Sequence, residues 1–300
     1  HPCPLLQRYD FRGASANYHG CVDLLAKIPN NRSVGFRFPC MDGQNTPSPR
    51  AYAEILNAVS GAGNFMSSST SVGIVFTPAD PAVPKSIFEG DPAGARRFSK
   101  YLMKGFVNYV ENYPYPFVVG NLIWELPFVY PNDYTGQALH GSQNPITIAD
   151  FKAAVDATVA KQGAVSLCFH AGGWMSSEQM ADIVDHADLT HGKKMKFLNM
   201  REMHDRIVKN MLAGYPLRRA DGGDNGVRVF DINGDGLMDV LIANQKAKLS
   251  RIWQPEQRAW RDISFPVALH HDLRFGVLDE SGRAVAVAPK PDGVSMVRPG

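Results

Sequence analysis

Hydrophobic residues follow two periods along the first two thirds of the chain. Short apolar runs predict strands, and segments whose apolar residues recur every three or four positions predict helices. The predicted strands cover residues 34–39, 72–78, 117–125, 164–170 and 196–198. The predicted helices cover residues 14–28, 51–59, 95–112, 148–161 and 201–213, and a further helix begins at Ser176. Strands that alternate with helices in this way indicate an α/β fold with a mainly parallel sheet.

The stretch Ala164–Trp174 (AVSLCFHAGGW) organises this first region. Its apolar run is too short for a helix and is bounded by glycines, so we expect a buried strand that stops at His170. Chemistry in α/β folds usually lies at the carboxyl ends of strands, which makes His170 a candidate functional residue. The alternative is a histidine that only fills the strand end. Arg37, in the strand 34–39, needs a partner for its charge, either in a structural ion pair or in a site.

The pattern changes after Pro216. A polar linker over residues 218–226 precedes two apolar runs that flank the loop Asp231–Asp239. Oxygen-bearing side chains stand at loop positions 1, 3, 5 and 9, and position 7 offers a backbone carbonyl. These five residues are Asp231, Asn233, Asp235, Asp239 and Leu237. Because Ca²⁺ takes six or more hard oxygen ligands, the loop is predicted to be a calcium site between two strands. The alternative is an acidic turn without metal.

A weaker copy of this layout follows over Leu273–Ala288. Asp279 stands where the first copy has Asp231, at a spacing of 279 − 231 = 48 residues. The copy keeps too few oxygen side chains for calcium. Repeated units of several strands predict blades of a β-propeller. Trp253 and Trp260 lie between the copies, where packing between blades is favoured over stacking on sugars.

The expected organisation is therefore an α/β domain over residues 1–216 and a small all-β domain over residues 217–300. Composition narrows the function classes: the 300 residues are 44% hydrophobic and 20% charged, and a net charge of +2 provides no basic face for nucleic acid. No apolar run approaches the roughly 20 residues that span a bilayer. The four cysteines match no zinc-ligand spacing, and Cys168 is predicted to be a small buried hydrophobe.

Several short motifs, taken in order, resemble the polysaccharide deacetylases of carbohydrate esterase family four, the NodB-homology domain. They are His1-Pro2 with the CPLL that follows, Arg37-Phe38-Pro39, and Leu167–His170. Further motifs are similar to a bacterial deacetylase-like group in which this domain is joined to calcium-binding repeats of the FG-GAP/VCBS type. They are Asn45–Arg50 and His191–Lys194 with Lys196–Leu198. The resemblance covers nearly all of the chain and implies an incomplete (β/α) barrel, followed by a partial β-propeller, that hydrolyses N- or O-acetyl groups on a glycan.

The resemblance also implies site residues. His1 is similar to the second histidine of the family's His-x-x-x-His-Pro motif, a ligand of Zn²⁺ or another divalent metal in the full-length parent. Arg37 is similar to the arginine that orients the catalytic aspartate, and His170 to the histidine that acts as general acid on the leaving amine. Trp174 is a candidate wall of the acetyl pocket. Glu125, at a strand end, either lines the substrate cleft or makes a structural pair.

The sequence departs from the family at several points. The family's aspartate pair and first motif histidine precede the position of His1, so we expect the chain as given to be inactive. Cys40 stands where an aromatic residue is common, and Ala171-Gly172 follows His170 in place of an acidic or proline residue. His186 and His191 are predicted to be a helix face and its cap region.

Two function classes remain open. One is a metal-dependent glycan deacetylase, and the other is a non-catalytic carbohydrate-binding or structural surface protein with a calcium-stabilised repeat. Both imply a polysaccharide or oligosaccharide partner, with no nucleic acid and no membrane span. The predicted calcium loop and the glycan substrate favour a secreted, cell-surface or periplasmic location, because free calcium is abundant outside the cell. Oligomeric state is not predicted.

Overall fold

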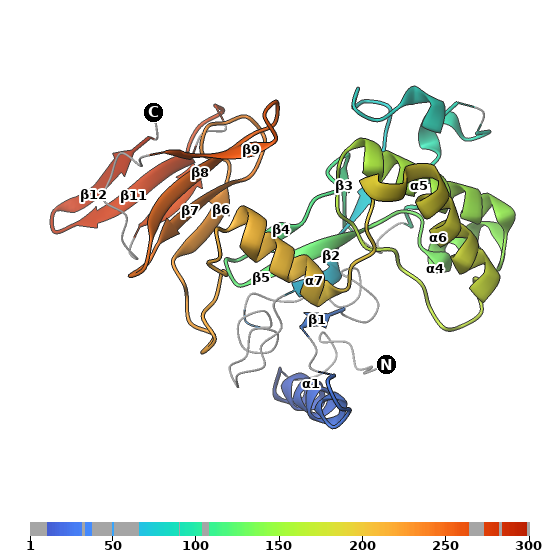
Figure 1. The fold of residues 1–300 in the computed structure, drawn as a ribbon, viewed down its shortest axis with the longest axis horizontal. Coiled ribbons are helices and arrows are strands. Elements are labelled where there is room, and N and C mark those ends of the chain that lie inside the picture. Colours follow the sequence, from blue (N-terminus) through green and yellow to red (C-terminus); the bar gives the residue numbers. More distant parts are fainter. Residues whose placement is uncertain are drawn as a thin grey trace. The chain divides into compact units, whose positions relative to one another are not determined.

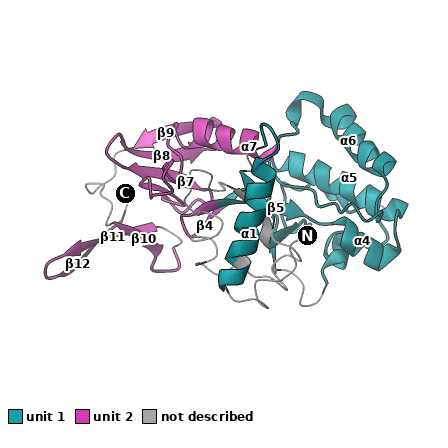
Figure 2. Cartoon of the chain, turned by 90° about the horizontal axis from the view of Figure 1, so that it is seen from below, with its two compact units in different colours: residues 1–56, 64–117, 124–198 teal, residues 57–63, 118–123, 199–300 magenta. Residues whose placement is uncertain are grey.

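The structure is a computed structural model that describes residues 11–31, 34–37, 50, 66–89, 91–103, 108–263, 273–281 and 284–298. His1, Cys40 and the helix expected over residues 51–59 lie outside the described residues. The chain divides into two compact units, coloured separately in Figure 2. Unit 1 comprises His1–Leu56, Asn64–Phe117 and Trp124–Leu198, and unit 2 comprises Asn57–Gly63, Val118–Ile123 and Asn199–Gly300.

Unit 1 combines a parallel sheet with helices (Figure 1). Its strands are β1 (Gly35–Phe36), β2 (Met66–Val75), β3 (Asn108–Glu111) and β5 (Ile123–Val129). β5 pairs with one edge of β2, and β1 and β3 pair with the start and the end of the other edge, all in parallel. Every residue of β5 is buried, so this strand lies in the middle of the unit, as expected of a parallel sheet covered on both faces.

The helices of unit 1 are α1 (Phe11–Ala26), α4 (Asp133–His140), α5 (Pro145–Ala160) and α6 (Ser177–His191). The last three begin at polar caps. Ser176 caps α6 as predicted, in a capping box with Gln179. Helix α5 begins earlier than predicted, because Asn144 rather than Thr147 is its N-cap and Pro145 takes the first helical position.

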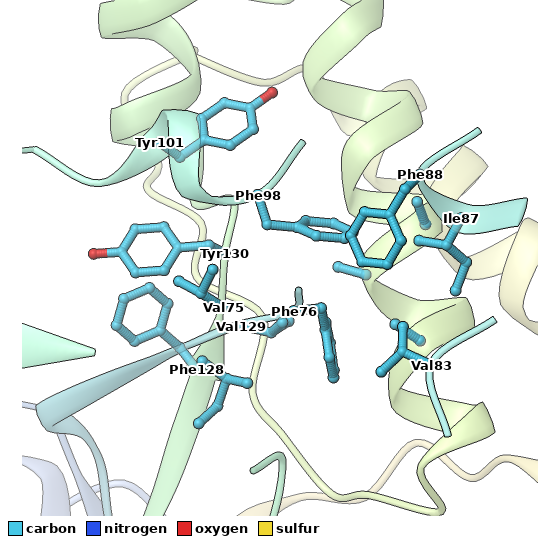
Figure 3. Packing of buried hydrophobic residues seen from close by; sticks show 14 of the residues in the cluster. Val75, Phe76, Val83, Ile87, Phe88, Phe98, Tyr101, Phe128, Val129 and Tyr130 are labelled. Atoms are coloured by element: carbon cyan, nitrogen blue, oxygen red, sulfur yellow. The ribbon is translucent and has the colours of Figure 1, made fainter. Parts of the chain in front are cut away.

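The core of unit 1 is rich in aromatic side chains (Figure 3). Phe76 at the end of β2 packs edge-on against Phe98, and Phe128 of β5 packs against Tyr130. Cys168 belongs to this cluster and is 2% exposed, which confirms the prediction of a buried hydrophobe. The core therefore extends from the sheet to the segment that leads to His170.

A buried carboxylate fixes the segment between β2 and β3 against α5. Asp150 is fully buried and lies 2.7 Å from Arg97 Nε, from Lys100 Nζ and from the hydroxyl of Tyr101, which donates to it. Burial and the nearby carboxylate raise the pKa of Tyr101, so its hydroxyl keeps the proton that it donates. Two cations and one phenol thus stabilise a charge that would otherwise be costly to bury.

The prediction of a helix over residues 95–112 is wrong. The chain instead forms short 3-10 turns, η2 (Lys85–Ile87), η3 (Gly94–Arg96) and η4 (Ser99–Tyr101), and then strand β3. Contacts with Asp150 hold the turns, and Leu102 adopts extended backbone after η4. Residues 109–110 pair with β2. Tertiary contacts have overridden a helical spacing of apolar residues.

Three strand predictions need correction. Residues 117–125 form β4 (Phe117–Val119) and the start of β5, because Gly120 and Asn121 both adopt φ of 57° in a turn between them. Residues 164–170 run beside β5 but make only an isolated parallel bridge, Phe128 to Ser166, since Pro127 has no N–H for a longer ladder. Residues 196–198 form no strand, and Phe197 is 55% exposed.

Unit 2 begins with α7 (Met200–Arg206), which continues into a π-helix, η6 (Ile207–Met211). Two antiparallel sheets follow, one with the order β6–β7–β8–β9 and one with the order β10–β11–β12. The strands are Val227–Phe230, Asp239–Ala243, Lys248–Gln254 and Ala259–Ile263 in the first sheet, and Arg274–Val277, Ala284–Lys290 and Gly293–Val297 in the second. Both predicted run-turn-run segments are therefore antiparallel strands.

In the part of the chain that the structure describes, no helix has the length and apolar character needed to cross a membrane.

Candidate functional site

The candidate site of unit 1 is centred on His170 and a buried carboxylate. Asp133 Oδ1 lies 2.7 Å from His170 Nδ1, and Asp133 Oδ2 accepts a hydrogen bond of 2.5 Å from the backbone N–H of His170. The Asp133 side chain is fully buried, whereas that of His170 is 40% exposed. One carboxylate therefore fixes both the backbone and the ring of an accessible histidine. Among the described residues, no hydrogen bond engages the other ring nitrogen, Nε2.

Local structure explains how Asp133 reaches His170. Asp133 is the first residue of α4, directly after the N-cap Asn132, whose side-chain oxygen accepts a bond of 2.8 Å from the N–H of Thr135. The N–H of Asp133 donates to the carbonyl of Cys168 at 3.3 Å. The carboxyl end of β5 is thereby joined to the carboxyl end of the neighbouring segment, the location predicted for chemistry in an α/β fold.

Arg37 contacts the same segment from β1. Its Nη2 donates to the hydroxyl of Ser166 at 3.0 Å. Burial raises the pKa of the Cys168 thiol, while the Arg37 guanidinium acts in the opposite direction. A side chain from the first strand reaches the segment beyond β5, so the sheet curls on itself. Arg37 thus contacts the same short segment, residues 164–170, that ends at His170, so the two predicted site residues belong to one region of unit 1.

Two aromatic rings lie near the partly exposed imidazole of His170. The ring of Trp174 lies 5.0 Å from that of His170 and 5.3 Å from that of Tyr134, between centroids. The crevice that Asp133 and Trp174 line together leaves no volume for a water molecule. A ligand would therefore lie on the open face of these rings rather than in the crevice.

Glu125 lies apart from these residues. It is the third residue of β5, next to Ser67 of β2 in register, and it is fully buried. His170 lies beyond the carboxyl end of the same sheet, and strands advance about 3.3 Å per residue. The structure thus places Glu125 within the sheet and does not bring it to His170.

Asp133 is the functional residue that sequence reasoning missed. The signal was available: Asn132-Asp133 follows the apolar run that became β5, as His170 follows the next extended segment. Polar residues directly after two neighbouring parallel strands meet at one edge of the sheet. The prediction of a strand over 117–125 obscured this, because it ended the strand four residues before Val129.

The predicted calcium loop forms between β6 and β7, as the pattern indicated. Asp231 Oδ1 accepts from the N–H of Gly234 at 2.6 Å, and its Oδ2 accepts from the N–H of Gly236 at 2.7 Å. Both glycines adopt positive φ, 80° and 81°, which lets the chain fold around the Asp231 carboxylate. Asp235 Oδ1 accepts from the N–H of Leu237 at 2.8 Å, and Asn233 donates to Asp235 Oδ2 at 2.9 Å. The oxygen-bearing side chains thus share one tight loop.

Asp239 closes this loop and is fully buried. Its carboxylate accepts from the N–H of Ile232 at 2.9 Å and from the N–H of Trp253 at 3.0 Å. Burial, together with the negative charges of Asp235 and Asp231, raises the pKa of Asp239 to about 6. A bound cation would relieve this unfavourable electrostatic environment, and carboxylate, amide and carbonyl oxygens are the ligands that Ca²⁺ prefers.

The corresponding acidic residue of the second copy is in a different environment. Asp279 accepts from the N–H and the hydroxyl of Ser281 and forms an ion pair with Arg298. These contacts lower the pKa of Asp279. An arginine of the chain itself therefore provides the positive charge at this position.

Trp253 and Trp260 face each other across β8 and β9, with ring centroids 5.2 Å apart.

Among the described residues, two groups of three histidine, cysteine or acidic side chains have ligand atoms close enough together to hold a metal ion as they stand, and the loop carboxylates of Asp231, Asp235 and Asp239 are not among them. One is Asp133, Cys168 and His170, and the other is Asp156, His186 and His191; in each, the ligand atoms lie within 4.8 Å of one another. In the first group, Cys168 is 2% exposed within the hydrophobic core, and its raised pKa favours the protonated thiol, which is not a metal ligand. Without the thiolate, the remaining pair of Asp133 and His170 is better suited to an oriented histidine than to a metal centre.

A cavity of about 410 Å³ lies in unit 2, beside α7 and η6. It is lined by residues between His204 and Pro216, none of which sequence reasoning selected.

The chain matches no protein-family model, no curated protein and no solved structure. Fold and side-chain geometry are therefore the grounds on which its function can be proposed.

Proposed function

We propose that the chain is a deacetylase-like protein that acts on glycans, with His170 as the general acid of a hydrolytic reaction. The observation that carries this proposal is the double contact of Asp133 with His170, which orients the imidazole and leaves Nε2 available. The curled parallel sheet of unit 1 is compatible with an incomplete (β/α) barrel of the NodB-homology type, which we propose as its architecture. The motif resemblance at Arg37 and His170 supports the same assignment.

The proton chemistry follows from the hydrogen bonds. Nδ1–H of His170 donates to Asp133, so Nε2 is the nitrogen that gains and loses a proton. When Nε2 is protonated, the negative charge of Asp133 stabilises the imidazolium, which then donates to the departing amine or hydroxyl of the sugar. Arg37 acts as a positioning residue, because it binds the segment on which His170 stands. Trp174 offers an aromatic face to the sugar ring.

The proposed reaction also needs a divalent metal, which would polarise the acetyl carbonyl and activate water. His1, its expected ligand, lies outside the described residues. The group of Asp133, Cys168 and His170 fits a zinc ion poorly for the reasons given above. Asp133 and His170 are therefore assigned to proton transfer.

Acetate release from acetylated glycans tests the proposal. The full-length parent that carries the family's aspartate pair, supplied with Zn²⁺, should release acetate, and His170→Ala should lower the rate at least about 10²-fold, the lower range for general acid catalysis. His19→Ala is a matched control, because His19 is a half-buried imidazole on α1. Equal rates for the parent chain and His170→Ala would contradict the acid role.

A second candidate function is carbohydrate binding without chemistry. It is favoured by the adjacent rings of Tyr134, Trp174 and His170, which form an aromatic surface suited to stacking on sugars. Under this proposal the parent chain releases no acetate from any acetylated glycan but binds oligosaccharides, and Trp174→Ala abolishes that binding. In both proposals unit 2 is a calcium-stabilised scaffold of the FG-GAP/VCBS type, and the protein acts outside the cell or in the periplasm.

A further inference from the structure

Two histidines and an aspartate converge between α5 and α6, in unit 1. Nε2 of His186 lies 2.9 Å from Asp156 Oδ1, and Nε2 of His191 lies 2.7 Å from the same oxygen. The two imidazole rings are nearly perpendicular, at 88°, with centroids 6.3 Å apart. Two ring nitrogens from α6 and one carboxylate oxygen from α5 therefore lie close together in one small volume.

The helix pair that carries these residues is well fixed. Lys152 of α5 bonds Asp182 of α6 at 2.7 Å, and one turn further along both helices Asp156 meets His186. Because the numbering rises in the same direction on both helices, α5 and α6 run parallel. Apolar residues of the two helices pack together below these contacts; they include Phe151, Val155, Ile183 and Ala187. Ligands on packed helices keep their spacing better than ligands on loops.

The three groups match the ligands of a zinc site. Zinc binds imidazole nitrogen and carboxylate oxygen at about 2.0–2.2 Å, and sites with three protein ligands keep a fourth position for water. Tetrahedral geometry at those distances separates ligand atoms by about 3.3 Å. The atoms of Asp156, His186 and His191 lie within 4.8 Å of one another. A small widening of the present contacts would admit the ion.

The surroundings also suit metal binding. An imidazole that binds metal through Nε2 carries its proton on Nδ1, which needs an acceptor. The hydroxyl of Thr190 lies 3.4 Å from Nδ1 of His186. The side chains of Asp156, His186 and His191 are 32%, 24% and 14% exposed, so an ion and its water can reach them from solvent.

We propose that Asp156, His186 and His191 form a Zn²⁺ site that ties α5 to the end of α6. The site is separate from His170 and does not depend on the proposed deacetylase activity. It replaces two hydrogen bonds to a single carboxylate oxygen with three metal–ligand bonds. Its role is to hold the last turn of α6, where His191 is the final residue before Gly192.

Calorimetric titration of the metal-stripped full chain with Zn²⁺ tests the proposal. The parent chain should bind one ion at this site, and Asp156→Asn, His186→Gln and His191→Gln should each weaken binding at least about tenfold. His204→Gln, on α7, is the matched control and should bind as the parent does. His170→Gln separates this site from the group around Cys168, and it should also bind as the parent does.

The contrary outcomes are distinct. Equal zinc binding by the unsubstituted chain and by a variant that carries Asp156→Asn, His186→Gln and His191→Gln together would overturn the proposal. Binding that is lost in His170→Gln alone would overturn it as well. Should the substitutions unfold the chain, the unaltered protein gives a second measurement. Zn²⁺ should slow amide hydrogen exchange in the last turn of α6, and unchanged exchange would likewise overturn the proposal.

Discussion

Asp133 in unit 1 and Asp239 in unit 2 are both buried carboxylates at the centre of a candidate site, but the groups that contact them carry different charges. Asp133 contacts the imidazole of His170, a group of the chain that can carry the opposite charge. Asp239 contacts two backbone N–H groups and lies near two further carboxylates, Asp231 and Asp235. The first carboxylate has a partner within the chain that can carry positive charge. The second lies near carboxylates whose charges a cation from solvent would offset, and this difference supports the proposals of proton transfer at one site and calcium binding at the other.

The largest effect should come from breaking the contact between Asp133 and His170. In Asp133→Asn the amide keeps the shape of the side chain but loses the charge that stabilises a protonated His170. We expect acetate release by the full-length parent to fall by about 10²–10⁴-fold, with a smaller change in KM. Asp182→Asn, at a carboxylate of α6 that is 55% exposed, is the control. A pH–rate profile that is identical in parent and Asp133→Asn would contradict the positioning role.

The next largest effect concerns stability and involves a third buried carboxylate. Asp150 contacts Arg97 and Lys100 at 2.7 Å, so Asp150→Ala would leave these two cations with their longer contacts to Asp91, at 3.5 and 3.8 Å. Breaking a buried ion pair in this way typically costs about 3–5 kcal/mol. Urea unfolding of the full chain should show the loss in the transition that belongs to unit 1. A loss below about 1 kcal/mol would show that the cations find other partners.

The two sites also differ in how far the sequence predicts them. The loop between Asp231 and Asp239 is contiguous, and its spacing alone predicted the flanking strands, which the structure confirms, and the candidate calcium ligands. The site around His170 depends on contacts between distant segments: Asp133 lies 37 residues from His170, and Arg37 lies 129 residues from Ser166. The sequence therefore placed His170 at a strand end but did not reveal its carboxylate partner.

The incorrect predictions about the fold have the same origin, namely contacts between segments that are distant in the sequence. Residues 95–112 have the apolar spacing of a helix, but contacts with Asp150 and pairing with β2 decide their structure. Residues 164–170 have the composition of a strand, but Pro127 on the neighbouring strand limits the pairing. By contrast, the limits of α6 follow from Ser176 and Gly192, both signals that are local in sequence. The local signals at both ends of α6 were read correctly, and the local signal at the start of α5 was not. Long-range contacts were not accessible from the sequence.

A smaller, pH-dependent effect should distinguish Asp239 from Asp133. The folded pKa of Asp239 is raised to about 6 from an ordinary value of 3.8, so the folded state favours the protonated form. Without calcium, unit 2 should be most stable below about pH 4 and should lose on the order of 1–3 kcal/mol as the pH rises through 6. Calcium should reverse this trend, because it binds the ionised loop.

Thermal unfolding in EDTA and in Ca²⁺, at pH 4.5 and pH 7.5, measures this effect. Asp239→Asn and Asp235→Ala should remove the calcium-dependent stabilisation. Asp279→Asn is the matched control, because Asp279 occupies the corresponding position of the second copy and has Arg298 as its partner. An equal calcium response in Asp235→Ala and the parent chain would count against the loop as a calcium site.

The smallest effect should come from an ion pair near the surface of unit 1. Lys161 bonds Asp80 at 2.5 Å and lowers the pKa of Asp80, the opposite direction to Asp239. The stability from this pair should be complete above about pH 4, the ordinary pKa of an aspartate, and should be lost as the pH falls through the lowered value. Both side chains are less than 20% exposed, so Asp80→Asn should cost up to about 1 kcal/mol at pH 7 and less at pH 2. Asp182→Asn, in the more exposed pair with Lys152, should cost less at either pH. Equal losses at both pH values would show that Asp80 acts through its contact with Ala82 rather than through its charge.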